Sequence, residues 1–253
     1  LEAVIMFVLF EFACGNCPTR QQVIRGFLSR GLQSLKAIGL LWKIENYDDC
    51  SVLLRGILER MYTLAHLADT DEFELFEEWS FYIQCQYQNK TWAEVDRRES
   101  RGIPGFDRSP EEDARYKLLA KNPPQWRRPK AETALKRLKY GPLFHFGYES
   151  SSTLVHPMAT DGYRDFYSLT KLEPNPVFPD TRHILNNSIL MTVVLVQVGL
   201  QASNLKWRGI VNQFIDEMLT FLETGEHVYR ASFEKIAILV RDGVGLSDAD
   251  KNV

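Results

Sequence analysis

Apolar residues recur every three or four positions along much of this chain, and that spacing constrains its fold more than any other feature. In an α-helix such spacing brings the apolar side chains onto one face. The stretch 20–45 carries it at Val23, Phe27, Leu28, Leu32, Leu35, Ile38 and Leu41. A second stretch reaches residue 68 and carries it at Leu54, Ile57, Leu58, Met61 and Ala65. Because no stretch shows convincing strand alternation, the sequence predicts an all-α helical bundle.

Proline residues mark the regions where this helical pattern is interrupted. Most of the 11 prolines fall between 104 and 179, which predicts an irregular middle section with an excursion at 98–130. We expect a single domain over 1–253 with about seven helices, in which 20–165 forms the helical core and 180–241 the C-terminal helices. The remaining helices are expected at 71–92, 109–121, 131–140, 143–156, 180–202, 205–223 and 229–241, and a loop at 157–179.

Two helix beginnings carry capping signals. Asp48 or Asp49 is expected to cap the helix that ends near residue 68, because a short acidic side chain can accept the first free backbone N–H groups. Ser109-Pro110-Glu111-Glu112 predicts a capping box with proline at the first helical position.

Composition limits the classes of function. The formal net charge is −3, so nucleic acid can be attracted only by a local patch. The apolar stretch 189–200 is shorter than the roughly 20 residues that cross a bilayer, and the apolar N-terminus lacks the basic residues of a signal peptide; we therefore expect no membrane contact. Four cysteines do not make a disulfide framework and favour a cytoplasmic location.

Sequence motifs for common cofactors are absent or isolated. The sequence has no G-x-x-x-x-G-K, G-x-G-x-x-G, G-x-S-x-G or H-E-x-x-H motif, which argues against P-loop, Rossmann, α/β-hydrolase and zincin sites. Cys14 and Cys17 have redox-pair spacing, but no βαβ pattern follows them and no second ligand pair stands at zinc spacing. We expect neither a metal nor a cofactor, and we interpret these cysteines as small residues at a helix break.

A stripe of polar residues borders the apolar face of the helix at 48–68. Its members stand at positions i, i+4, i+7 and i+11: Arg55, Glu59, Tyr62 and His66. Charges beside a core are costly unless they are paired, and Ser152 and His156, also four apart on one face, are the expected partners. Such a set can tune a histidine for proton transfer. It can equally be a satisfied polar network that fixes helix register.

A second candidate site is the basic segment between residues 115 and 139. It contains Arg115, Lys117, Lys121, Arg127, Arg128, Lys130, Lys136, Arg137 and Lys139, with Trp126 among them. An aromatic ring among cations suits single-stranded nucleic acid, because bases stack on the ring while the cations meet phosphates. Trp126, Arg127, Arg128 and Lys130 are therefore candidate RNA-binding residues, although charge runs are more often solvated surface.

The motif Arg55-x-x-x-Glu59, followed by Ser152-x-x-Val155-His156-Pro157, resembles an all-helical bacterial family annotated only as a domain of unknown function. The resemblance covers residues 20–165. That family is loosely similar to HEPN proteins, many of which are metal-independent ribonucleases of toxin and phage-defence systems with an R-x(4–6)-H motif. In this sequence we take the arginine and the histidine from different helices.

The resemblance implies an RNase-like effector. Arg55 would bind the scissile phosphate and His156 would act as general base or acid. Glu59 would orient His156 or hold Arg55, and Ser152 would donate a hydrogen bond. Tyr62 and His66, which lie farther along the same stripe, are candidate binding residues.

Two alternatives stay open. The first is a non-catalytic sensor or interaction module, in which the polar set is structural and a partner protein or a second copy of the chain binds elsewhere. The second is a small-ligand pocket in the bundle, lined by Tyr62, Trp79, Tyr82 and His156.

Overall fold

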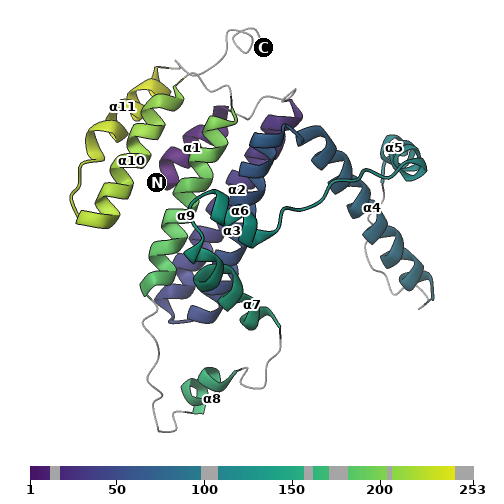
Figure 1. Cartoon of the computed structure of the whole chain (residues 1–253), viewed down its shortest axis with the longest axis horizontal. Coiled ribbons are helices and arrows are strands. Elements are labelled where there is room, and N and C mark those ends of the chain that lie inside the picture. The colour runs from purple at the N-terminus through teal and green to yellow at the C-terminus, as the bar shows by residue number, and fades with distance from the viewer. Residues whose placement is uncertain (12–17, 98–107, 157–161, 171–181, 204–206, 243–253) are drawn as a thin grey trace. The chain divides into compact units, whose positions relative to one another are not determined.

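The computed structural model describes residues 1–11, 18–97, 108–156, 162–170, 182–203 and 207–242 (Figure 1). Its helices are α1 (Glu2–Glu11), α2 (Thr19–Lys43), α3 (Tyr47–Thr70), α4 (Phe73–Arg97), α5 (Pro110–Lys121), α6 (Ala131–Arg137), η1 (Phe144–Glu149), α7 (Ser150–Val155), α8 (Tyr163–Thr170), α9 (Arg182–Gln201), α10 (Arg208–Thr224) and α11 (Arg230–Arg241). Within these ranges there is no strand, which confirms the all-α prediction. The helices outnumber the about seven expected.

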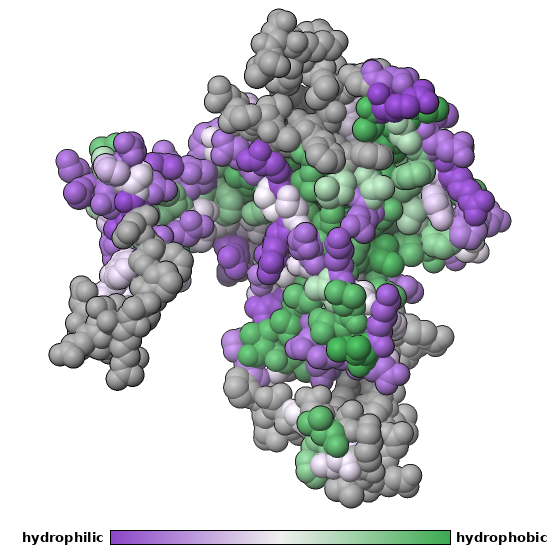
Figure 2. All heavy atoms as spheres, turned by 180° about the vertical axis from the view of Figure 1, so that it is seen from behind, coloured by the Kyte–Doolittle hydropathy of each residue, from purple (hydrophilic) through white to green (hydrophobic). Residues whose placement is uncertain are grey.

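The chain divides into two compact units. One contains Leu1–Asp69 together with Pro129–Val253, and the other is Thr70–Arg128. The second unit is larger than the excursion expected at 98–130, because it includes all of α4. Its visible surface is mostly hydrophilic in Figure 2, while its interior is aromatic, as described below.

Close contact between α2 and α9 builds the core of the first unit. A Cβ added to Gly31 on α2 would lie 2.5 Å from Leu195 Cδ2 on α9. A Cβ on Gly199 of α9 would lie 3.2 Å from Ile24 Cγ2. Helices approach this closely only where one partner lacks a side chain. The helices α1, α10 and α11 complete this part of the unit, since α1 contacts α2 and α11, and α10 contacts α9 and α11.

Helix α9 has a membrane-like composition but lies largely inside the unit. The stretch His183–Gln201 has a mean hydropathy of 1.5 and is long and apolar enough to span a membrane. The prediction that the apolar stretch is too short to cross a bilayer, which took only 189–200 into account, was therefore wrong. In the structure 56% of that window is buried, and the hydroxyls of Ser188 and Thr192 donate to carbonyl oxygens one turn earlier.

One of the two predicted caps is confirmed and the other is wrong. Ser109 Oγ accepts the Glu112 N–H at 3.2 Å, and Glu112 Oε2 accepts the Ser109 N–H at 2.8 Å, which completes the capping box of α5. At the start of α3 the capping side chain belongs to Asn46, whose Oδ1 accepts the Asp49 N–H at 3.3 Å. Asp48 and Asp49 instead lie in the first turn of the helix, where the helix dipole favours acidic residues.

The expected helix at 143–156 is two elements. Its first half, η1, is a π-helix, a rare form that often marks functional sites. Its second half, α7, is an ordinary α-helix. His145 in η1 is exposed, and its Nδ1 lies 2.8 Å from Glu149 Oε2. The expected loop at 157–179 contains the helix α8, and its remaining residues lie outside the described ranges.

Candidate functional site

Helix α3 places the predicted polar stripe against the segment 130–155. Arg55 Nε lies 3.1 Å from Glu59 Oε1, as its i, i+4 spacing predicts. The third member is Tyr148 of η1, whose hydroxyl accepts from Arg55 Nη2 at 3.4 Å. The guanidinium carbon of Arg55 also lies 4.6 Å from the centroid of the Tyr148 ring. The partner of the predicted ion pair is therefore a tyrosine, and neither Ser152 nor His156.

The same segment contacts α3 at two further points. A Cβ on Gly147 would lie 2.6 Å from Leu58 Cδ1, so η1 sits directly on α3. At the other end of α3, Arg137 Nη2 of α6 lies 2.7 Å from Asp69 Oδ2. Because α6 also contacts η1, the segment covers the polar stripe from Asp69 back to Arg55.

Ser152 and His156 do not join the Arg55–Glu59 pair. The hydroxyl of Ser152 in α7 donates to the carbonyl oxygen of Tyr148 in the preceding η1 at 2.8 Å, so the backbone supplies its hydrogen-bond partner. His156 ends α7 in an extended conformation, and it is exposed. It stands eight positions after Tyr148 along two consecutive helical elements, a rise of roughly 12 Å at the α-helical value.

Tyr62 and His66 continue the stripe toward Asp69. Tyr62 is one of the largest fully buried side chains, which suits the core better than a binding surface. His66 is half-buried, whereas the other four histidines, His145, His156, His183 and His227, are exposed. Arg55 and His66 are eleven residues apart on α3, about 16 Å along the helix axis, so they cannot contact the same phosphate group.

A pocket of about 280 Å³ opens beside His66. The other residues that line it come from α6 and the turn before it: Pro129, Lys130, Thr133, Ala134 and Arg137. Two residues proposed from the sequence as binding residues, His66 and Lys130, are thus brought to one pocket. The structure adds Arg137 as a second cation at that pocket.

The aromatic member of the basic segment is buried. Trp126 is 4% exposed, and its ring centroid lies 4.7 Å from that of Phe76 and 4.9 Å from that of Trp79. It forms the core of the unit Thr70–Arg128 and cannot stack on a base in this conformation. Arg127, Arg128 and Lys130 are exposed.

The remaining residues of the expected small-ligand pocket have partners elsewhere. Within Thr70–Arg128, Trp79 packs on Trp126, and Tyr82 stacks on Tyr116 at 5.7 Å between ring centroids. Tyr62 and His156 belong to the first unit. Neither of these two residues lines the pocket beside His66.

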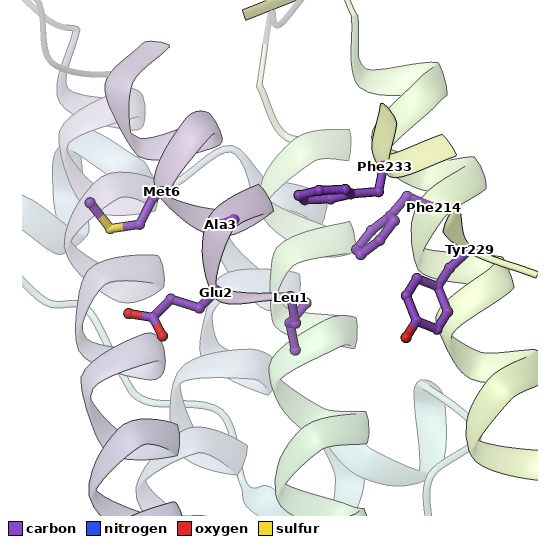
Figure 3. Close-up of a pocket in the computed structure, with 7 residues that line it drawn as sticks. All are labelled: Leu1, Glu2, Ala3, Met6, Phe214, Tyr229 and Phe233. Carbon is purple, nitrogen blue, oxygen red and sulfur yellow. The ribbon is translucent and has the colours of Figure 1, made fainter. Parts of the chain in front are cut away.

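A second pocket, of about 610 Å³, lies in the first unit (Figure 3). Its lining comes from Leu1, Glu2, Ala3 and Met6 at the N-terminal end, from Phe214 of α10, and from Tyr229 and Phe233 at the start of α11. In Figure 3 the three rings lie on the side of Leu1, whereas the side chains of Glu2 and Met6 point away from them. No motif described from the sequence indicates this pocket. Because its lining contains no histidine, cysteine, lysine or arginine, the reactive groups of this unit are better sought at His66.

Sequence reasoning also missed one spacing on α3. Arg60 and His66 have five residues between them, so the spacing R-x(4–6)-H does occur within one helix, and the sequence does not require an arginine and a histidine from different helices. Six residues turn a helix so that the two side chains stand about 120° apart. Arg60 Nη1 donates to the Gly56 carbonyl oxygen, one turn toward the helix N-terminus.

The structure assigns no metal role to the described residues. Among them, no group of three or more His, Cys, Asp or Glu side chains could hold an ion. Cys14 and Cys17 lie outside the described ranges. Cys50 is buried, and burial raises its pKa to about 11, with the Asp49 charge adding to the shift. Such a thiol stays protonated and unreactive near neutral pH.

Comparison with known proteins gives one match. Neither a curated protein nor a solved structure matches the chain. One family model matches residues 21–170, which run from α2 to the end of α8 and include α3, the His66 pocket and η1. This span agrees with the resemblance read from the sequence at 20–165. The chain belongs to the family of unknown function DUF5677.

Proposed function

We propose that this protein is a metal-independent, RNase-like effector of the kind used in toxin and phage-defence systems, acting in the cytoplasm on RNA. The observation that supports this function most directly is the pocket in which His66 meets Lys130 and Arg137. A half-buried imidazole beside two cations combines a proton-transfer group with charge stabilisation, and those are what phosphodiester cleavage without a metal requires.

The chemistry follows from these groups. His66 takes the proton from a ribose 2′-hydroxyl, whose oxygen attacks the adjacent phosphorus. The bond from phosphorus to the 5′-oxygen breaks, and that oxygen takes a proton from water. The products are a 2′,3′-cyclic phosphate and a 5′-hydroxyl. Lys130 and Arg137 stabilise the negative charge that builds on the phosphoryl oxygens in the transition state.

This proposal moves the catalytic role from His156 to His66. Arg55 and Glu59 pair with each other, and Arg55 also contacts Tyr148, so their arrangement supports a positioning role for η1. The Ser152 hydroxyl donates to the Tyr148 carbonyl oxygen and does not reach this pair. The original scheme, with Arg55 and His156 as the catalytic pair, remains the competing form of the same function.

Cleavage of a 5′-labelled single-stranded RNA in buffer with a chelator tests the proposal. Wild type is compared with His66→Ala, His156→Ala and Arg55→Ala. His227→Ala is the control, because His227 is exposed like His156 and does not line the His66 pocket. Circular dichroism first confirms that each variant is folded. We expect His66→Ala to lose about 100-fold or more of the rate, and His156→Ala and His227→Ala to keep it.

The other outcomes are equally decisive. Loss of cleavage confined to His156→Ala and Arg55→Ala would support an active site at Arg55 and His156 instead. Absence of cleavage by wild type would remove the ribonuclease proposal.

A non-catalytic interaction module is the second candidate. The observation that favours it is the separate unit Thr70–Arg128, which has its own aromatic core around Trp126 and an ion pair between Arg115 and Glu77. A unit of this kind can present a binding surface for a partner protein or a second copy of the chain. Inactive wild type together with a stable complex that is lost on deleting this unit would support the second candidate.

A further inference from the structure

The volume and the lining of the pocket beside His66 favour a particular class of ligand. Its volume of about 280 Å³ lies near the lower end of the roughly 300–1,000 Å³ of small-ligand pockets. Its walls are formed by Pro129, Thr133 and Ala134, by the imidazole of His66, and by Lys130 and Arg137, whose side chains have aliphatic stems. Such walls suit a flat, weakly polar ring.

Cations stand at the same pocket. Lys130 is exposed and lies in the turn before α6. Arg137 pairs with Asp69 at 2.7 Å, and both of these side chains are about half exposed. A guanidinium offers five N–H donors, so Arg137 can hold Asp69 and still donate to a second anion. The lining therefore combines apolar side chains and a planar imidazole with donors for a negatively charged group.

We infer that this pocket binds one nucleoside phosphate, with the base against His66 and Pro129 and the phosphate at Lys130 and Arg137. The ligand is either a free mononucleotide or one nucleotide of an RNA strand. In a strand, that nucleotide must be unstacked from its neighbours, so the pocket selects single-stranded over double-stranded RNA. Insofar as the ligand is RNA, this inference rests on the proposed function and names the substrate form of that site.

Equilibrium binding tests the inference without depending on cleavage. The probes are the four nucleoside monophosphates, inorganic phosphate, and fluorescent 2′-O-methyl oligonucleotides, single-stranded and duplex, which have no free 2′-hydroxyl to react. Two variants alter the pocket: Lys130→Ala removes a cation, and Thr133→Phe fills the space from an exposed position of α6. Lys136→Ala is the matched control, because Lys136 is an exposed cation of the same helix that pairs with Glu132 at 2.6 Å and does not line the pocket.

We expect a mononucleotide to bind with a Kd between about 10 μM and 1 mM. Lys130→Ala and Thr133→Phe should each weaken it about tenfold or more, and Lys136→Ala should not. Tighter binding of the single-stranded oligonucleotide than of the monophosphates, with the same response to the variants, identifies an RNA strand as the ligand. Equal or weaker binding of the oligonucleotide identifies the free nucleotide.

Three results would overturn the inference. The first is an affinity for inorganic phosphate equal to that for the nucleotides. The second is a loss of nucleotide affinity in Lys136→Ala equal to that in Lys130→Ala. The third is no binding of any probe. A protein that binds nucleotides at this pocket but cleaves no RNA would keep this inference and lose the proposed activity, so the two failures can be told apart.

Discussion

The guanidinium carbon of Arg55 lies 4.6 Å from the centroid of the Tyr148 ring, although the two residues are 93 positions apart in the chain. This contact joins α3 to the π-helix η1. It also explains how a charged pair can border the core: Arg55 and Glu59 are 19% and 27% exposed, and each charge has a partner. The ring supplies a cation–π contact and its hydroxyl supplies a hydrogen-bond acceptor.

Two substitutions at Tyr148 separate these contributions. Tyr148→Phe keeps the ring over Arg55 and removes the hydroxyl, so it should lower the free energy of unfolding by about 0.5–1.5 kcal/mol. Tyr148→Ala also removes the ring, its packing and the cation–π contact, and should cost about 2 kcal/mol more. Urea denaturation followed by circular dichroism measures both values. Equal losses in the two variants would mean that the ring contact contributes nothing.

Gly147, the neighbour of Tyr148, sets how closely η1 approaches α3. A Cβ at this position would lie 2.6 Å from Leu58 Cδ1, inside any normal contact distance. Because Leu58 is fully buried, Gly147→Ala should lower the free energy of unfolding by about 1–3 kcal/mol. Gly26→Ala is the control: nothing lies within 4 Å of its Cβ, so it should stabilise α2 by about 0.5–1 kcal/mol. Thermal denaturation of both variants tests the pair, and similar shifts in Tm would contradict the close approach.

Local signals in the sequence predicted the helices well because each depends on a few neighbouring residues. The apolar spacing in 20–45 corresponds to α2, and Ser109 with Glu112 forms the predicted capping box. The Arg55–Glu59 pair is likewise a property of one helix. The identity of the third partner is different in kind, because Tyr148 reaches Arg55 only through the path of the segment 130–155.

Trp126 and His66 show what a local sequence pattern leaves out. A tryptophan among cations has the same sequence pattern whether it stacks on a base or fills a core, and Trp126 fills a core with Phe76 and Trp79. His66 was predicted as a binding residue of the polar stripe, and its R-x5-H spacing from Arg60 is also present in the sequence. What distinguishes it from the other histidines is its pocket, which forms when α6 packs beside α3, and no local pattern carries that information.

Trp126 gives a prediction for the second unit. Its side chain is buried against Phe76 and Trp79, so Trp126→Ala should lower the free energy of unfolding of that unit by about 3–5 kcal/mol. The adjacent Arg127 is exposed, and Arg127→Ala should change stability by less than about 0.5 kcal/mol. Near-ultraviolet circular dichroism during urea denaturation reports on the tryptophan environment. A small effect of Trp126→Ala would contradict an aromatic core at this position.

Cys50 predicts how stability depends on pH in the alkaline range. Its side chain is fully buried in α3, and its Sγ lies 3.6 Å from the Ile38 carbonyl oxygen of α2. Burial, aided by the Asp49 charge, raises its pKa from an ordinary value of 9.0 to about 11. Between these values the unfolded chain loses the thiol proton while the folded protein keeps it, so the free energy of unfolding falls as pH rises from 9 toward 11.

The contribution of Cys50 can be isolated by comparison with Cys50→Ala, because tyrosine and lysine titrate in the same range in both proteins. We expect the wild type to lose more stability than the variant between pH 9 and pH 11, when each is followed by urea denaturation. At neutral pH, mass spectrometry should show slow alkylation of Cys50 by iodoacetamide until urea unfolds the chain, because only the thiolate reacts and the side chain is shielded. Parallel pH profiles for the two proteins, or rapid alkylation of the folded chain at this residue, would contradict a raised pKa in a closed contact between α2 and α3.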